Sequence, residues 1–206
     1  MKAFTNEQQI YLSLMIVGVF FALLILVFLF YRIFFRGKNL KNSTYKMLYR
    51  YSGLNDYLLL NNYHIHIDTN NVGDINHVLI SNKFIVVINV FPISGVLTGS
   101  YMDEQLRLTD KKGTKLIANP LNYNRNLTKR VALFNDLDNS FIKGIVVVNS
   151  DSVIKINDIP EQYFICKRSE LKKVLRIIDS IDVKPFKEDT VVDFINRLNK
   201  ENISSK

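Results

Sequence analysis

Cysteine is nearly absent from this chain of 206 residues, in which Cys166 stands alone. A single cysteine excludes an intramolecular disulfide and is compatible with a reducing cytoplasm. Cys166 lies in the apolar string YFIC, which predicts a small buried side chain rather than a reactive thiol. Tryptophan is absent altogether, and the sequence contains no internal repeat and no low-complexity tract.

Common catalytic signatures are also missing. The sequence has no phosphate-binding loop, no G-x-S-x-G string, no zinc-protease helix and no Cys/His pair that suggests nucleophilic catalysis. Asp103 and Glu104 are adjacent, and neighbouring side chains diverge on a strand or turn, so they make a weak acid–base dyad. The enzyme classes that carry those motifs are therefore excluded.

Charge is absent from the segment between Glu7 and Arg32. A helix rises about 1.5 Å per residue, so about 20 apolar residues cross a hydrocarbon core of about 30 Å. The uncharged run Gln8–Tyr31 meets that length, and we predict one transmembrane helix over residues 8–35. A cleaved signal peptide would have a shorter apolar core and a small-residue cleavage site. A core helix of a soluble protein would rarely be apolar on every face.

The residues that flank this segment predict its orientation. Only Lys2 and Glu7 are charged before it, whereas the residues that follow are rich in cations. These cations are Arg32, Arg36, Lys38, Lys41 and Lys46. The positive-inside rule therefore predicts a single-pass protein of the cell membrane, with its N-terminus outside and the following domain in the cytoplasm. The oligomeric state stays open.

Residues 40–200 suffice for one domain with its own core. Hydrophobic periodicity predicts helices over residues 40–60 and 119–137, a third capped by Ser169, and a last one opening at Asp189 or Thr190. Ser43 or Thr44 is the expected cap of the first. The predicted strands cover residues 63–68, 74–81, 84–91, 96–100, 105–109, 115–117, 143–149 and 163–167. This order indicates an α/β fold with a mixed central sheet.

Four stretches in this order resemble the nuclease-related domain (NERD) family. They are DINHVLIS at Asp74–Ser81, FIVVINVFPISGVLTGS at Phe84–Ser100, ANPLNYNRN at Ala118–Asn126, and an ending of KGIVVVN followed by two helices. Domains of this family are similar to divergent members of the PD-(D/E)XK nuclease superfamily. The resemblance covers residues 40 to 198 and implies a restriction-endonuclease-like fold, a mixed sheet flanked by helices.

The resemblance also implies where an active site would lie. Nuclease members carry an acidic residue on one strand and E-x-K on the next, and their carboxylates hold Mg²⁺, which activates a water. Aligned on that pattern, Asn89 occupies the Glu position and Phe91 the Lys position. The strand Asp falls on Asn76, or on Asp74 in another register, and His77 matches the family's His.

Two further family positions lie in helices. In the N-P-x-x-Q-N helix start, Tyr123 replaces the Gln and Asn124 keeps the Asn. The Glu that the family usually carries in its first helix has no counterpart, since no Glu occurs between Leu40 and Asp56. The resemblance therefore implies the fold and argues against the activity. We expect a pseudoenzyme without a cofactor.

Other chemistry is left open. An active nuclease with migrated ligands would use Asp74, His77 and Asp103 or Glu104, and would need Mg²⁺. His64 and His66 share a strand face and, with His77 and Asp74, could bind zinc or manganese, although the sequence favours surface histidines, since no fourth ligand lies at metal spacing.

A basic helix face suggests a last alternative. Arg125, Lys129 and Arg130 follow Tyr123 and Asn124 and could hold a phosphate backbone, or form an ordinary solvated face. The formal net charge of +8 suits anionic lipid or nucleic acid. The leading hypothesis is a non-catalytic binding or scaffold protein whose partners are the membrane and either a protein or a nucleic acid.

Overall fold

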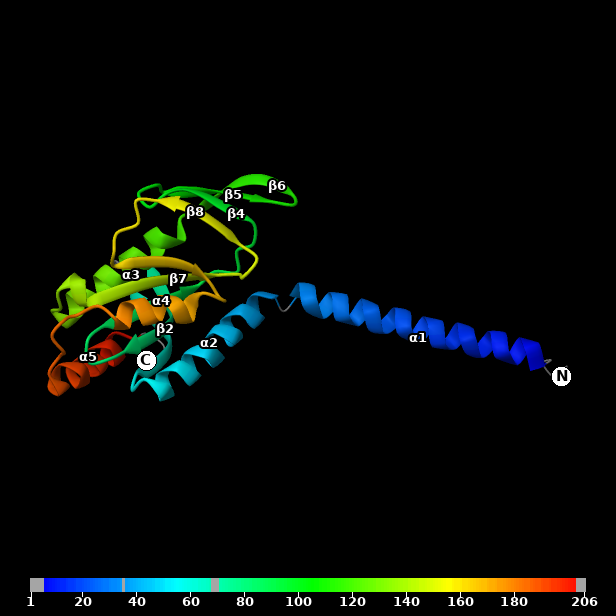
Figure 1. Cartoon of the computed structure of the whole chain (residues 1–206), viewed down its shortest axis with the longest axis horizontal. Coiled ribbons are helices and arrows are strands. Elements are labelled where there is room, and N and C mark those ends of the chain that lie inside the picture. Colours follow the sequence, from blue (N-terminus) through cyan, green and yellow to red (C-terminus); the bar gives the residue numbers. More distant parts are fainter. Residues whose placement is uncertain (1–5, 35, 68–70, 203–206) are drawn as a thin grey trace. The chain divides into compact units, whose positions relative to one another are not determined.

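The computed structural model describes residues 6–34, 36–67 and 71–202. The chain divides into two units, Met1–Asn39 and Leu40–Lys206. The first unit contains helix α1 (Asn6–Phe34), the blue end of the ribbon in Figure 1. The helix predicted over residues 8–35 is therefore present as far as Phe34, and residue 35 lies outside the described residues.

Helix α1 is apolar on every face. Its stretch Leu14–Tyr31 has a mean hydropathy of 3.0, and none of it is buried. A core helix of a soluble domain would be mostly buried, so that alternative is wrong for α1. Within the described part of the chain, α1 is the one helix whose length and composition suit a membrane span or a signal sequence.

The second unit is built on a five-stranded mixed sheet in the order β1-β2-β3-β7-β9. Its strands are β1 (Leu58–His66), β2 (Val72–Ile80), β3 (Ile85–Val90), β7 (Ile142–Val148) and β9 (Tyr163–Lys167). β1, β2 and β3 pair antiparallel, whereas β3, β7 and β9 pair parallel. The predicted mixed central sheet and the restriction-endonuclease-like α/β fold class are confirmed.

A second, four-stranded sheet has the order β6-β5-β4-β8. It consists of β4 (Val96–Ser100), β5 (Gln105–Asp110), β6 (Gly113–Ala118) and β8 (Val153–Asn157), and lies at the top of the domain in Figure 1. Strand β8 was not predicted from the sequence, and neither was the departure of β4 to β6 from the central sheet. The segment Phe91–Gly95 after β3 carries the chain from one sheet to the other.

Helices cover both faces of the central sheet. Helices α3 (Pro120–Asn135) and α5 (Glu188–Glu201) pack on one face, and α2 (Arg36–Leu54) and α4 (Leu171–Asp179) on the other. β3 serves both cores, because Ile85 and Val87 face α3 while Val86 and Ile88 face α2 and α4. Burying an aliphatic side chain of this size contributes about 1.5–3 kcal/mol.

Most helix ends follow the local chemistry of the sequence, and some correct our predictions. Asn119 caps α3, since its side chain accepts a hydrogen bond from the backbone N–H of Leu121 at 3.0 Å. Helix α2 starts well before Ser43 and Thr44, so neither is its cap, and it ends at Leu54 rather than at residue 60. Asp56 has a φ of 53°, which stops the helix and lets Leu58 enter β1.

The two C-terminal helices begin slightly away from the predicted caps. The residue that precedes α4 is Glu170 rather than Ser169, and its side chain makes no capping hydrogen bond. Helix α5 begins at Glu188, before Asp189 and Thr190. Burial of α4 and α5 against the core, rather than a side-chain cap, therefore defines where each of these helices starts.

Asp179, in the last turn of α4, joins α4 to α2. Its carboxylate accepts hydrogen bonds from the hydroxyls of Tyr51, on α2, and Tyr57, between α2 and β1. Burial, followed by the hydrogen bond to Asp179, raises the pKa of both tyrosines, so both hydroxyls stay protonated donors.

Candidate functional site

The candidate site lies where β2 and β3 separate. Their backbone pairing runs from Ile80 and Ile85 to His77 and Ile88 and stops there. Beyond that point two side-chain amides bridge the strands. Asn89 Nδ2 donates to the backbone oxygen of Asp74 at 2.6 Å, and Asn76 Oδ1 accepts from the backbone N–H of Val90 at 2.7 Å. Amides therefore replace the backbone ladder at this end of the two strands.

Asn124 of α3 completes this arrangement. Its Nδ2 donates to Asn89 Oδ1 at 3.0 Å and to the backbone oxygen of Val87 at 3.3 Å. Asn124 is fully buried and Asn89 is 2% exposed. We call the group Asn76, Asn89 and Asn124 the amide fork. Both the nitrogen and the oxygen of the Asn89 amide therefore make hydrogen bonds within the protein.

Gly144 on β7 gives Asn124 its space. A Cβ at Gly144 would lie 2.2 Å from Asn124 Oδ1 and 2.8 Å from Tyr163 Cδ1. The absence of a side chain therefore lets α3 approach the sheet closely enough for Asn124 to reach Asn89. This role of Gly144 was not predicted from the sequence. A lone glycine within the apolar strand KGIVVV was the signal that could have revealed it.

Aromatic rings close the outer side of the fork. The Tyr123 hydroxyl accepts a hydrogen bond from the backbone N–H of Asp74 at 2.7 Å, and burial raises the pKa of Tyr123. The ring of Phe91 packs edge-on against the Tyr123 ring, with centroids 5.9 Å apart. At the position that the resemblance aligns with the family's lysine, this chain therefore has an aromatic contact and no charge.

The carboxylate of Asp74 is engaged elsewhere. Its Oδ1 lies 2.6 Å from His64 Nδ1, across the β1–β2 pair, where Asp74 is exposed and His64 is half-buried. His66 lies exposed further along β1. Only the backbone of Asp74 takes part in the bridge to Asn89.

His77 is separate from that pair. Its Nδ1 lies 2.6 Å from Asn61 Oδ1, and because that oxygen can only accept, Nδ1 carries the proton. The ring is 2% exposed and stacks on Tyr45 of α2. Burial and then the nearby charge of Lys41 lower the pKa of His77 to about 4, so the ring is neutral at pH 7. Asn61 was not predicted to take part.

The two alternative ligand sets are not assembled. Among the described residues, no three His, Cys, Asp or Glu side chains gather where they could hold one metal ion. Asp103 serves a turn instead, because its Oδ2 accepts from the backbone N–H of Ser100 at 2.7 Å. The backbone oxygen of Asp103 also accepts from the side chains of Asn119 and Asn122. The backbone oxygen of Glu104 accepts from the Asn119 N–H.

The predicted basic face of α3 is only partly available. The Arg125 guanidinium lies over the Tyr101 ring at 5.3 Å, and its Nη1 lies 3.9 Å from Met102 Sδ. Lys129 is exposed and Arg130 is half-buried. One of the three cations is therefore held against the protein's own side chains.

Two of the three comparisons with known proteins found nothing, and one found a match. A family model described as "Nuclease-related domain" matches residues 36–149, more than half of the chain. The matched region begins at α2 and ends just after β7, so it includes the whole amide fork. A search of curated proteins and a search of solved structures gave no match.

Proposed function

The chain belongs to the nuclease-related domain family, and from that premise we propose that it is a membrane-anchored binding protein whose domain does not cleave nucleic acid. In this proposal the domain is a pseudoenzyme that holds a protein or nucleic-acid partner at the cytoplasmic face of the cell membrane. Its location then accounts for much of its function.

One observation carries the proposal, the hydrogen bonding of Asn89. Nuclease relatives need a carboxylate at this position, because Mg²⁺ is a hard cation that takes oxygen ligands. Here Nδ2 faces the backbone oxygen of Asp74, and Oδ1 is occupied by Asn124. Leaving a buried polar group without its partner costs about 1–3 kcal/mol. The residues of the fork therefore do not fit Mg²⁺, and they hold β2 and β3 together without it.

A cleavage assay tests the loss of activity. The full-length protein, purified in phosphatidylcholine nanodiscs, is expected to leave linear DNA and RNA intact with Mg²⁺ or Mn²⁺. Metal-dependent cleavage that disappears in Asp74→Ala and persists in the matched variant Asp193→Ala would overturn the proposal. Asp193 is an exposed residue of α5 and serves as the control for loss of one carboxylate.

Restoring the carboxylates tests the same point without relying on activity. We expect Mg²⁺ to raise the Tm of Asn76→Asp/Asn89→Glu and to leave that of the wild type unchanged. A ligand present at 100 times its Kd stabilises a fold by about 2.7 kcal/mol, which a thermal scan resolves. An equal Mg²⁺-dependent shift in both proteins would show that the fork already binds the ion.

The membrane part of the proposal has its own support. The uncharged run Gln8–Tyr31 lies within α1, and cations follow it in the sequence. We propose that α1 spans the cell membrane once, with the N-terminus outside. The alternative use of such a helix, as a signal sequence, predicts that the mature protein lacks α1.

Thiol labelling distinguishes the two. The exposed turn residue Lys111 is changed to Cys in the full chain. Burial, followed by the charge of Glu170, raises the pKa of the native Cys166 to about 12, so that thiol contributes little background. An impermeant maleimide is expected to label Lys111→Cys only after the membrane is permeabilised. Labelling in intact cells, or a mature mass without α1, would contradict this topology.

A further inference from the structure

On the other face of the sheet, α2 and α4 border a groove of about 610 Å³. Five cations line it, and no acidic side chain does. These cations are Lys46 and Arg50 of α2, Arg168 at the end of β9, and Lys172 and Arg176 of α4. We call this the cationic groove. It is separate from the amide fork, whose side chains face α3.

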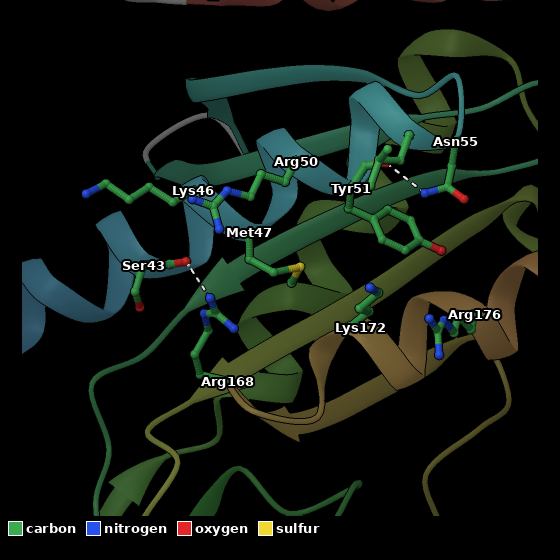
Figure 2. Close-up of a pocket in the computed structure, with 10 residues that line it drawn as sticks. Ser43, Lys46, Met47, Arg50, Tyr51, Asn55, Arg168, Lys172 and Arg176 are labelled. Carbon is green, nitrogen blue, oxygen red and sulfur yellow. Dashed lines mark hydrogen bonds between the residues drawn. The ribbon is translucent and has the colours of Figure 1, made fainter.

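The groove is built from regularly spaced side chains. Lys46 and Arg50 are one helical turn apart, as are Lys172 and Arg176, so each helix presents a pair of cations on one side. Figure 2 shows Arg168 pointing from the end of β9 toward Ser43 of α2, on the same side of the sheet as these two pairs. Sequence spacing alone could reveal each pair, but only the sheet topology brings them together.

Arg168 is the most constrained of the five. Its Nη2 donates to the backbone oxygen of Ser43 at 2.7 Å, a bond drawn in Figure 2. Its Nε is buried and has no hydrogen-bond partner among the described residues. Burial lowers the pKa of Arg168, but a guanidinium keeps its proton at pH 7. A fixed positive charge therefore stands between the two helices.

These cations form no ion pair with the described residues. Across the described part of the chain, no carboxylate oxygen lies within 4.0 Å of any of the five cations. The nearby acids have other partners, since Asp179 accepts from two tyrosines and Glu170 pairs with Lys167 at 3.7 Å. Like charges one turn apart each destabilise a helix by about 0.2–0.5 kcal/mol. An anion in the groove would remove that repulsion.

The chemistry of the lining indicates which anion fits. Guanidinium groups bind phosphate oxygens in a bidentate way and ammonium groups add point charges, so a mixed set of Arg and Lys is typical of phosphate recognition. The volume lies within the range of about 300–1,000 Å³ that small-molecule sites occupy. Met47 and Leu54 also line the groove and offer apolar contact to whatever carries the phosphate.

We propose that the cationic groove binds a phosphate-bearing anion with two or more negative charges, and this does not depend on the amide fork being inactive. The source is either an anionic lipid headgroup or a free phosphate compound. Ser43 follows α1 by only about nine residues, and a chain of that length spans at most about 30 Å. If α1 is a membrane span, headgroups are therefore the phosphate source within closest reach.

The test uses the full-length protein in nanodiscs at 150 mM salt, with two probes. Inorganic pyrophosphate is titrated against nanodiscs of phosphatidylcholine alone, and the Tm is compared between these and nanodiscs containing phosphatidic acid. Lys172→Gln/Arg176→Gln removes two exposed groove cations. Lys111→Gln/Lys112→Gln removes two exposed cations from the β5–β6 turn and is the matched control.

Pyrophosphate binding, or a Tm rise with phosphatidic acid, is expected to fall at least tenfold or vanish in the groove variant and to persist in the control. A response to pyrophosphate identifies a soluble source, and a response to phosphatidic acid alone identifies a lipid. Equal losses in both variants would show general electrostatic attraction and overturn the proposal. The absence of any response would do the same, as would groove-dependent binding of a DNA oligonucleotide without binding of either phosphate probe.

Folding of the variants is checked independently. Arg168→Lys keeps the charge but loses the bidentate geometry, so we expect weaker pyrophosphate binding with an unchanged circular dichroism spectrum. A failure of groove binding leaves the cleavage and Mg²⁺ results on the amide fork unaffected. Metal-dependent cleavage, conversely, would overturn the proposed function and leave this site standing.

Discussion

The amide fork and the cationic groove lie on opposite faces of one sheet and differ in their charge and in how their polar groups are paired. The fork contains three side-chain amides, of which those of Asn89 and Asn124 are buried, and no formal charge, and its members bond to one another and to the backbone. The groove contains five cations without an ion-pair partner among the described residues, and most of them reach solvent. Burial explains the difference, because an unpaired charge is tolerated in water and is costly in a core.

The contrast bears on where function lies. The sequence features of the family concentrate around β2, β3 and the start of α3. There the amides of Asn76 and Asn89 are hydrogen-bonded, whereas Asn124 Oδ1 is buried without a partner among the described residues. Cations without an ion-pair partner among the described residues lie between α2 and α4. In our proposals, the region that resembles an active site is a structural junction, and the region with unpaired cations binds the ligand.

Placing a charge in the amide fork should have the largest effect on stability. Asn89→Asp removes the donor to the Asp74 oxygen and buries a carboxylate without a counter-ion. We expect a loss of about 3–4 kcal/mol in unfolding free energy at pH 7, measured by urea denaturation.

The pH dependence of that variant has a defined sign. Burial raises the folded-state pKa of the new carboxyl above its unfolded value, so the variant's deficit relative to wild type grows as pH rises between those two values and shrinks below the unfolded one. Asn42→Asp, at an exposed position of α2, is the control and should change little. A deficit that is equal at pH 4 and pH 7 would mean that charge burial is not the cause.

Filling the space at Gly144 should have the next largest effect. In Gly144→Ala the new Cβ would overlap Asn124 Oδ1 and Tyr163, so α3 must shift and the bond to Asn89 must weaken. We expect a loss of about 3 kcal/mol, at the upper end for an overpacked core. Gly53→Ala is the matched control, since nothing lies within 4 Å of its Cβ, and α2 should gain about 0.5–1 kcal/mol. An unchanged unfolding free energy in Gly144→Ala would show that the packing around Asn124 can adjust.

His77 provides a pH test on the α2 side of the sheet. Its folded pKa of about 4 lies below the unfolded value of 6.5, so protonation favours the unfolded state. The stability is complete above the unfolded pKa and falls as pH drops toward 4. Between pH 8 and pH 5 this amounts to about 2 kcal/mol by linkage. His77→Gln should flatten the profile in that window, and an unchanged slope would assign the acid sensitivity to another group.

Neutralising the groove should give the smallest effect. In a buffer without phosphate at 10 mM salt, Lys172→Gln/Arg176→Gln should raise the unfolding free energy by about 0.5 kcal/mol, because repulsion is relieved. The gain should vanish at 1 M NaCl, where the Debye length is about 3 Å. The turn variant Lys111→Gln/Lys112→Gln should show a smaller gain in unfolding free energy. A loss of stability instead would mean that the two side chains stabilise the fold by packing.

Much of the fold was predictable because its signals are local. The cap at Asn119 followed by Pro120 places α3, and continuous apolar runs place β3 and β7 in the centre of the sheet. β8 was missed because its short alternating segment pairs with β4, far away in sequence. The boundary of α2 was misplaced because helical spacing continues past Leu54, whereas the backbone turns at Asp56.

The candidate site was predictable in position but not in bonding. The resemblance pointed to Asn76, Asn89 and Phe91, and these residues do lie where β2 and β3 part. Their roles stay predictions. That Asn124 would satisfy Asn89 depends on the close approach of α3 over Gly144, a tertiary fact. The groove likewise depends on two helices far apart in the chain sharing one sheet face.

The two tyrosine hydroxyls on Asp179 have a consequence for affinity and selectivity. They fix the end of α4 to α2 and to the turn that follows it, so the two walls of the cationic groove keep a set spacing before any ligand arrives. A preorganised site loses little conformational entropy on binding, and it also cannot widen to suit a larger guest. The groove therefore discriminates between anions by size because these hydrogen bonds hold its walls in place. A Tyr57→Phe variant should bind a broader range of anions, each less tightly.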